Sequence, residues 1–482
     1  MVFNSLSYFL FLPVVFLVHY FSRDSFRWLV LLVASFSFYA TLKAPHLILV
    51  LLLVTTVTYC TGIWIDRNEN QNTKRYLLWG GITTNILTLV ILKYLPFLTQ
   101  NLNVLINLVT PGTAIPVSKT ILAIGSSFFI FQGISYLIDI YLEIEKPENH
   151  FGRFALYMSF FPKLLQGPIE RGGDLLPQLK QPYVFNYDNM RSGMLLFTWG
   201  LFKKVVVADR LALFVNPVYD NVHSYTGLTL VLATYLYALQ LYFDFSAYTD
   251  MALGTARLFN INLTQNFNSP YRATSIADFW RRWHISFSRW ILDYIFKPLQ
   301  MNLRDRKNVG TAIALIVTFL ISGIWHGASW CFVVWGGLHG LYLTVSVFYK
   351  PLQKKIYKKL RLDKTKIQEI WQIVITFNLV CFAWIFFRAN SLADAWYIVT
   401  HLFYGNGDSI SLILSQNYNE LIITITLIIL MLIIGREKYQ GKSIEIIFTK
   451  PAIIRWSCYY IMVMTILLFW VISNQAFIYG NF

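Results

Sequence analysis

Apolar runs of about 20 residues recur along almost the whole chain, separated by short polar loops. A helix needs about 20 apolar residues to cross a bilayer, whereas a barrel strand needs about 10 residues of alternating polarity. The pattern predicts an all-α polytopic membrane protein with about eleven transmembrane helices and one or two re-entrant or interfacial helices. The predicted runs cover roughly residues 3–21, 26–43, 45–65, 76–95, 119–142, 192–214, 227–258, 309–349, 367–387, 418–434 and 453–474.

Residues 143–191 do not follow this pattern, because prolines and basic residues are scattered through them. Their apolar stretch, Phe154–Leu165, is too short to cross a bilayer. Non-helical backbone at membrane depth is tolerated only where protein or a watery cavity covers it. We therefore predict a re-entrant or interfacial segment on the cytoplasmic side that lines a cavity.

The apolar run 309–349 has basic residues on both flanks, so both of its ends are expected on the cytoplasmic side. One helix of about 41 residues would be roughly 60 Å long, about twice the 30 Å hydrocarbon core. The chain must therefore enter the membrane and return. Gly323 and Gly327 flank the natural turn, and His326 lies at it. This geometry predicts that His326 lies deep in the membrane.

Residues 276–296 carry aromatic residues on one helical face and charged residues on the opposite one. We predict an amphipathic helix that lies near the membrane interface, with His284 directed toward apolar packing. The aromatic face comprises Phe279, Trp283, Phe287, Trp290 and Tyr294, and the charged face comprises Asp278, Arg282, Arg289 and Asp293.

Charged residues also fall inside two apolar runs. Lys203, Lys204, Asp209 and Arg210 lie in 192–214, and Asp244 and Asp250 lie in 227–258. A lipid-facing lysine at the bilayer centre costs about 2.5–3.5 kcal/mol, so the first four are expected near the interface or facing the bundle interior. For the two aspartates, hydrogen bonds between helices are the favoured role.

The composition supports a membrane protein: 56% of the 482 residues are hydrophobic and 13% are charged, against about 25% charged in soluble domains. The formal net charge is +16, and the positive-inside rule explains the basic loops more simply than nucleic-acid binding does. The four cysteines are scattered singly, so neither a metal site nor a disulfide framework is expected. Phe3–Phe21 lacks a basic n-region and is interpreted as a retained helix.

Two interpretations of His326 stay open on position alone: a structural histidine bonded to a neighbouring helix, or a functional one. A neutral imidazole can take a proton from a hydroxyl that attacks a thioester and return it to the leaving thiolate. Basic residues near the cytoplasmic interface could attract the phosphates of a coenzyme A donor, although lipid head groups explain any single one of them as well. These candidates are Arg281, Arg282, Arg289 and Lys297.

The stretch Phe279–Trp290, followed by Ser322–Trp330, resembles the signature region of membrane-bound O-acyltransferases. The resemblance is to the bacterial branch that contains the membrane subunit of alginate O-acetylation and its peptidoglycan O-acetylating relatives. It extends over nearly the whole chain. Further matching stretches are Met158–Ile169, Tyr242–Asp250, Asn266–Tyr271, Phe382–Arg388 and the aromatic tail Phe477–Phe482, which departs from the usual pattern at Gly480 and Asn481.

The resemblance implies one domain over 1–482, a ring of tilted helices around a membrane tunnel, with 266–349 as the catalytic signature region. It places the invariant catalytic histidine, the general base, on His326 and the second signature histidine on His284. It also implies acetyl-CoA as donor, no permanently bound cofactor, an exported polysaccharide as acceptor, and a separate extracytoplasmic esterase-like protein as partner. The expected location is the bacterial inner membrane.

Two other functions remain possible from the sequence. One is D-alanyl transfer to teichoic acid from a carrier protein by the same fold, although the additional spans in 367–482 favour the alginate-like branch. The other, from a different class, is a transporter of lipid-linked sugar, in which Asp244, Asp250 and His326 would line a polar tunnel. The sequence does not identify the glycan.

Overall fold

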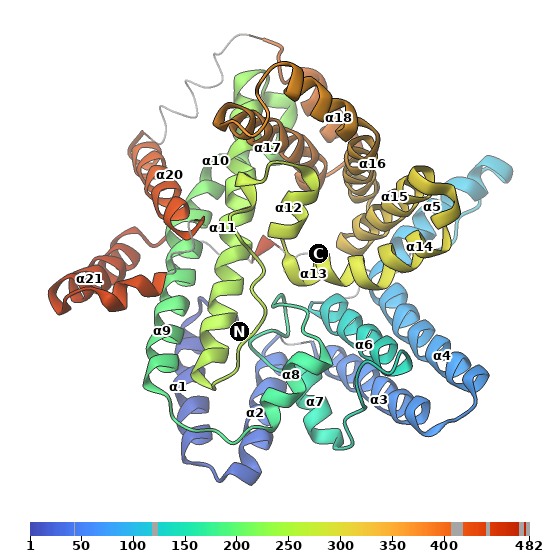
Figure 1. Ribbon diagram of the computed structural model, residues 1–482, viewed down its shortest axis with the longest axis vertical. Helices are drawn as coiled ribbons and strands as arrows, with labels where there is room; N and C mark the ends of the chain where they lie inside the picture. The colour runs from blue at the N-terminus through green and yellow to red at the C-terminus, as the bar shows by residue number, and fades with distance from the viewer. Residues whose placement is uncertain (43, 118–123, 406–417, 440–443, 472–476, 479–482) are drawn as a thin grey trace. The chain divides into compact units, whose positions relative to one another are not determined.

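The computed structural model describes residues 1–482 apart from 43, 118–123, 406–417, 440–443, 472–476 and 479–482 (Figure 1). The described residues form α-helices joined by loops and short 3-10 and π-helical segments, and no β-strand occurs among them. The predicted all-α class is therefore confirmed.

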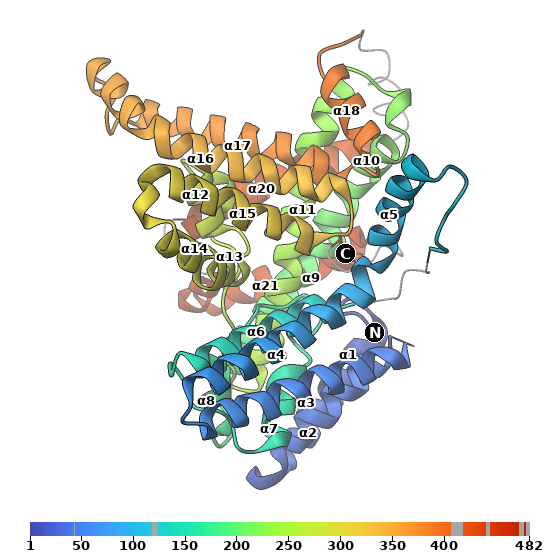
Figure 2. The ribbon, with the colours of Figure 1, turned by 90° about the vertical axis from the view of Figure 1, so that its right-hand side faces the viewer.

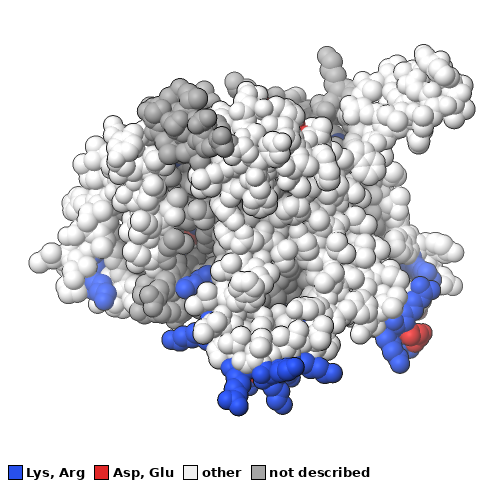
Figure 3. All heavy atoms as spheres, turned by 90° about the horizontal axis from the view of Figure 1, so that it is seen from above, with Lys and Arg blue, Asp and Glu red and all other residues white. Residues whose placement is uncertain are grey.

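Seven of the described helical segments are long and apolar enough to cross a membrane. Most of the surface seen in Figure 3 carries neither acidic nor basic side chains, as a lipid-facing surface requires. The chain is thus a multi-pass membrane protein, although the predicted number of about eleven spans is not confirmed. The seven are Pro45–Arg67, Gln71–Val109, Leu228–Leu258, Arg304–His326, Trp330–Lys359, Lys366–Arg388 and Ala452–Phe469, and Leu6–Phe21 and Tyr418–Met431 are shorter apolar helices.

The described residues form two compact units, of which the first comprises Met1–Phe197 and Tyr248–Thr264. In this unit α3 (Pro45–Arg67), α4 (Gln71–Leu89) and α6 (Ser126–Tyr141) pack against one another (Figure 2). Helix α6 covers most of the predicted run 119–142, whose first residues lie outside the described part. The unit's other helices are α1 (Leu6–Phe21), α2 (Asp24–Ala40), α5 (Leu95–Val109), α7 (Phe151–Ser159) and α8 (Gly172–Lys180).

Residues 143–191 contain only short helices among the described residues up to Asn186. Both α7 and α8 have nine residues, about 13 Å at 1.5 Å per residue, which is too short to span a bilayer. Every residue of Phe154–Leu165 is buried. The stretch is therefore interior structure, and its re-entry into the membrane stays a prediction.

The second unit comprises Thr198–Ala247 and Gln265–Ile478, and α15 (Lys307–His326) and α16 (Trp330–Lys359) form a helical hairpin within it (Figure 2). Glycines let the two helices approach closely. A Cβ on Gly323 would lie 2.2 Å from the Phe332 carbonyl oxygen, and one on Gly336 would lie 2.2 Å from that of Phe319. The predicted return of the chain after His326 is confirmed.

The predicted run 192–214 is not one continuous α-helix. Helix α9 (Tyr187–Phe202) gives way to a π-helical segment, Lys203–Ala208, before α10 (Asp209–Asp220) begins. Helices α9 and α11 (Leu228–Leu258) run through the boundary between the units. The remaining long helices are α17 (Lys366–Arg388), α18 (Leu392–His401), α20 (Tyr418–Tyr439) and α21 (Ala452–Phe469), and residues 472–474 of the last predicted run lie outside the described part.

The prediction of one amphipathic helix over 276–296 is wrong. Helix α12 (Ile276–Arg282) ends before Trp283, and α13 (Ile285–Ile291) begins after His284, whose φ is 44° and ψ 57°. The preceding extended segment explains the break, because Asn266 accepts the Ile285 N–H at 3.0 Å through its carbonyl and the Ser286 N–H at 3.1 Å through its side chain. These bonds replace the helical ones that the break removes.

Candidate active site

His326 is the last residue of α15, and only 2% of its surface is exposed. The chain turns at once, since Gly327 is extended and a Cβ on it would lie 2.1 Å from the Phe332 ring. The imidazole is enclosed by aromatic rings from four helices. The ring centroids lie 4.8 Å from Trp325, 4.8 Å from Trp335, 5.3 Å from Phe387 and 5.6 Å from Phe287.

His284 lies at the break between α12 and α13, where it is 1% exposed. Its ring contacts Phe245 at 4.8 Å, Phe287 at 5.1 Å and Trp325 at 6.2 Å between centroids. Burial lowers the pKa of His284 to about 3, so the ring is neutral at physiological pH. The predicted apolar surroundings are confirmed.

The structure brings His326 and His284 together. Both rings contact Phe287 and Trp325, which stack on each other at 4.3 Å. The two histidines are 42 residues apart in sequence, and the hairpin and the α12–α13 break place them at one aromatic cluster.

A third buried histidine, His339 on α16, was missed by the sequence analysis. It is 0% exposed, and the Trp280 indole N–H donates to its Nδ1 at 3.3 Å. Its ring lies 5.1 Å from Trp335, which in turn contacts His326. The available signal was a histidine four residues after a tryptophan in an apolar helix, a spacing that places both side chains on one face.

The four candidate cations lie apart from this aromatic cluster, at the surface or in local ion pairs. The Arg281 side chain is 73% exposed, and its guanidinium lies 3.9 Å from Asp278. Arg289 is exposed as well. Arg282 pairs with Asp278 at 2.9 Å and Lys297 pairs with Asp293 at 2.7 Å. The side chains of Arg281 and Arg289 are thus exposed at the surface.

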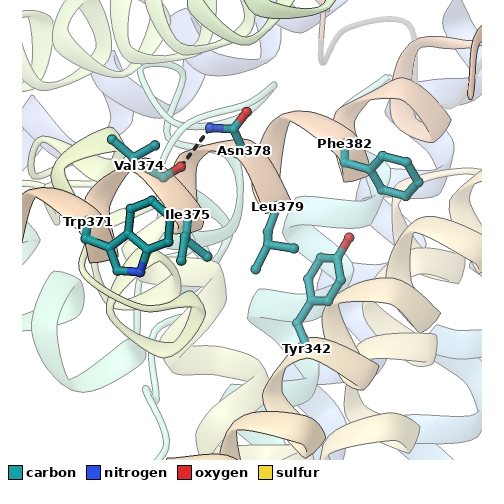
Figure 4. Close-up of a pocket in the computed structure, with 7 residues that line it drawn as sticks. All are labelled: Tyr342, Trp371, Val374, Ile375, Asn378, Leu379 and Phe382. Carbon is teal, nitrogen blue, oxygen red and sulfur yellow. Dashed lines mark hydrogen bonds between the residues drawn. The ribbon is translucent and has the colours of Figure 1, made fainter. Parts of the chain in front are cut away.

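An apolar groove lies on α16 and α17 (Figure 4). It has a volume of about 500 Å³. Its Tyr342 ring lies 5.9 Å from His339, and Asn378 within it donates to the Val374 carbonyl at 2.8 Å. The groove is lined by Tyr342 of α16 and by Trp371, Val374, Ile375, Asn378, Leu379 and Phe382 of α17.

The charged residues of the π-helical segment form a separate buried cluster in the same unit. Lys204 Nζ lies 2.9 Å from Asp209 and 2.7 Å from Asp244. The second oxygen of Asp244 accepts the Ile478 N–H at 2.8 Å, and the Phe477 ring covers the Lys204 ammonium at 4.4 Å. The expectation that Asp244 hydrogen-bonds between segments of the chain is confirmed.

The sequence model of the membrane-bound O-acyltransferase family matches residues 34–392. The chain belongs to this family, and it is therefore an acyltransferase of the membrane. The family relationship agrees with the helical fold and with the histidines buried among aromatic rings.

Individual relatives indicate which branch of the family this chain resembles. A peptidoglycan O-acetyltransferase of Helicobacter pylori is 33% identical over 98% of this chain and 96% of its own. A probable alginate O-acetylase AlgI of Azotobacter vinelandii is 35% identical over 84% of this chain and 78% of its own. A teichoic acid D-alanyltransferase of Bacillus subtilis is 26% identical over 65% of this chain and 78% of its own. The resemblance to the O-acetylating branch is confirmed.

Proposed function

We propose that this protein takes acetyl groups from cytoplasmic acetyl-CoA and delivers them through the membrane for O-acetylation of an exported polysaccharide. The observation that carries the proposal is His326, an imidazole enclosed by aromatic rings at the end of an apolar helix, with His284 at the same cluster. The relatives named for peptidoglycan and alginate O-acetylation support the polysaccharide acceptor.

In the proposed reaction His326 is the general base. Its neutral imidazole accepts the proton of the acceptor hydroxyl as the oxygen attacks the thioester carbonyl, and returns a proton to the leaving thiolate. The aromatic rings around His326 exclude water, which would otherwise hydrolyse the thioester. His284 orients the base or the substrate through the shared rings Phe287 and Trp325.

The donor is expected to meet exposed cations on the cytoplasmic side. Arg281 and Arg289 are exposed and would pair with coenzyme A phosphates, with Arg282 and Lys297 close by in sequence. The proposed partners are an extracytoplasmic esterase-like protein that passes acetyl to the glycan, the exported polysaccharide and the lipid bilayer, and the proposed location is the bacterial inner membrane.

The test is transfer of radiolabelled acetyl from acetyl-CoA by the purified protein in liposomes. We expect His326→Ala to reduce coenzyme A release and label transfer by about 100-fold or more, while the protein accumulates normally. His223→Ala removes an exposed histidine and serves as the matched control. Acetyl transfer that survives His326→Ala would refute the role of this residue.

A second candidate function is D-alanyl transfer, which the Bacillus subtilis relative favours. The same liposomes supplied with a D-alanyl carrier protein distinguish the two donors, because only one should give His326-dependent turnover. Movement of a lipid-linked sugar without any acyl donor would instead indicate the transporter function.

A further inference from the structure

We propose that the N–H groups of Trp335 and His339 form an oxyanion-binding subsite beside His326, which holds the negative charge that develops on the acyl carbonyl oxygen. The inference rests on the proposed acyl transfer and adds two residues that contact the reacting atoms. It comes from two buried hydrogen-bond donors that have no acceptor within the described part of the chain.

The hydrogen bond from Trp280 fixes which nitrogen of His339 carries the proton. The Trp280 indole can only donate, so Nδ1 of His339 accepts at 3.3 Å. A neutral imidazole with an accepting Nδ1 carries its proton on Nε2. That Nε2–H is buried and meets no acceptor among the residues the structure describes.

Trp335 provides a second donor of the same kind. Its side chain is 0% exposed, and its indole N–H also meets no acceptor within the described residues. Buried indole N–H groups normally find a partner, because an unpaired one costs free energy. Two such donors on neighbouring side chains are what a site for an oxygen atom with negative charge requires.

One donor contacts the proposed base directly, and the other contacts the first. Trp335 and His339 are four residues apart on α16, so they share one helical face. The Trp335 ring lies 4.8 Å from His326 and 5.1 Å from His339. Trp384 stacks on Trp335 at 5.8 Å with an interplanar angle of 16°. This packing holds the donors in place before the reaction begins, which is how such sites act.

The subsite has a defined place in the transfer step. The acceptor oxygen gives its proton to His326 and forms a bond to the thioester carbonyl carbon, and the carbonyl π electrons move to the oxygen. The Trp335 and His339 N–H groups donate to this oxyanion. When the carbonyl re-forms, the carbon–sulfur bond breaks, and the thiolate leaves with the proton held by His326.

The experiment compares Trp335→Phe, which removes the N–H and keeps an aromatic ring, with the intact protein in liposomes supplied with acetyl-CoA. We expect kcat to fall about 100-fold with an unchanged KM for acetyl-CoA. We expect the melting temperature to change little, because the variant loses an unpaired buried donor but also loses packing around a smaller ring. Trp396→Phe, on α18 and 66% exposed, is the matched control and should retain full activity.

His339 supplies a second, independent pair of variants. His339→Gln can accept from Trp280 and still donate, whereas His339→Leu can do neither. We expect the Gln variant to retain at least tenfold more activity than the Leu variant. The subsite is refuted if Trp335→Phe keeps kcat within twofold of the intact chain, or if the Gln and Leu variants are equally active. Since the intact chain and His326→Ala are measured in parallel, failure of the subsite alone leaves the intact chain active and His326→Ala inactive. Failure of the proposed function instead leaves the intact chain without acetyl transfer, or leaves His326→Ala as active as the intact chain.

Discussion

The second unit buries polar side chains in two different ways. At Lys204 an ammonium group lies between two carboxylates, with distances of 2.9 and 2.7 Å. At His326 an imidazole lies among aromatic rings, and two neighbouring N–H groups meet no acceptor within the described residues. Both sites are closed to solvent. At Lys204 the charged groups already pair with one another, whereas the Trp335 and His339 N–H groups have no acceptor among the described residues.

This difference separates structural from chemical roles. A buried charge is tolerated when partners surround it, and its removal leaves those partners without compensation. The Lys204 cluster is complete in this sense, so it serves the fold. The His326 cluster contains two N–H donors, on Trp335 and His339, that meet no acceptor among the described residues, and such donors can bind a developing negative charge. Unused polar groups, and not burial alone, therefore mark the reactive site.

Among the tests of this comparison, Lys204→Met should have the largest effect on stability. The change leaves Asp209 and Asp244 buried without their shared counter-ion, so we expect a loss of about 3–5 kcal/mol of stability. The melting temperature in detergent and accumulation in the membrane report this loss. Lys297→Met is the control, because its ion pair is exposed and worth about 0–1 kcal/mol. Adding Asp244→Asn to Lys204→Met should restore part of the stability, and no restoration would argue against the charge explanation.

A second test acts on the hairpin that frames the histidines. A Cβ in Gly336→Ala would lie 2.2 Å from the Phe319 carbonyl oxygen, so α16 must move away from α15. We expect a loss of about 1–3 kcal/mol and reduced acetyl transfer, because Trp335 moves with its helix. The adjacent Gly337→Ala is the control, since its nearest neighbour would be Leu320 Cδ2 at 3.8 Å. Equal effects from both variants would contradict the close-contact explanation.

The backbone conformation of His284 and the role of its ring can be tested separately. Asparagine tolerates the left-handed conformation that His284 adopts, so His284→Asn should keep most of the stability. We expect its acetyl transfer to fall about 10-fold or more, since the imidazole is lost. His284→Val should also unfold more easily, because a left-handed β-branched residue costs about 1–2 kcal/mol. Full activity in the Asn variant would show that His284 contributes only packing.

The sequence predicted those features that depend on local length and polarity. The hairpin followed from a run twice the bilayer thickness with basic flanks, and the turn after His326 lies where the glycines indicated. His284 is buried as expected, although the continuous helix on which that expectation rested breaks at this residue. The hairpin and its turn are determined by residues that lie close together in the sequence.

Features that depend on remote segments could not be predicted. The helix break at His284 results from hydrogen bonds to Asn266, about 20 residues upstream. Asp244, one partner of Lys204, comes from α11, and its second oxygen accepts the N–H of Ile478, far along the chain. The unpaired state of the Trp335 and His339 donors emerges only when the side chains of four helices are packed together.

Glu145, in the first unit, is a half-buried carboxyl whose acidic neighbours outnumber its basic one. Burial raises its pKa to about 8, and the carboxylates of Asp139 and Asp174 add to the rise while Arg171 opposes it. The folded state therefore holds a proton that the unfolded chain releases near pH 4.5. The resulting stabilisation is complete below that pH and is lost as the pH rises through about 8.

Glu145→Gln keeps the neutral form at every pH. We expect its melting temperature to fall less than that of the intact protein between about pH 6 and pH 9, with equal values at the acidic end. Glu69→Gln, at an exposed position, should follow the intact protein throughout. If the melting temperatures of all three proteins changed with pH in parallel, ionisation of Glu145 would not destabilise the folded state. The like-charged neighbours of Glu145 would then affect stability less than the opposite charges around Lys204 do.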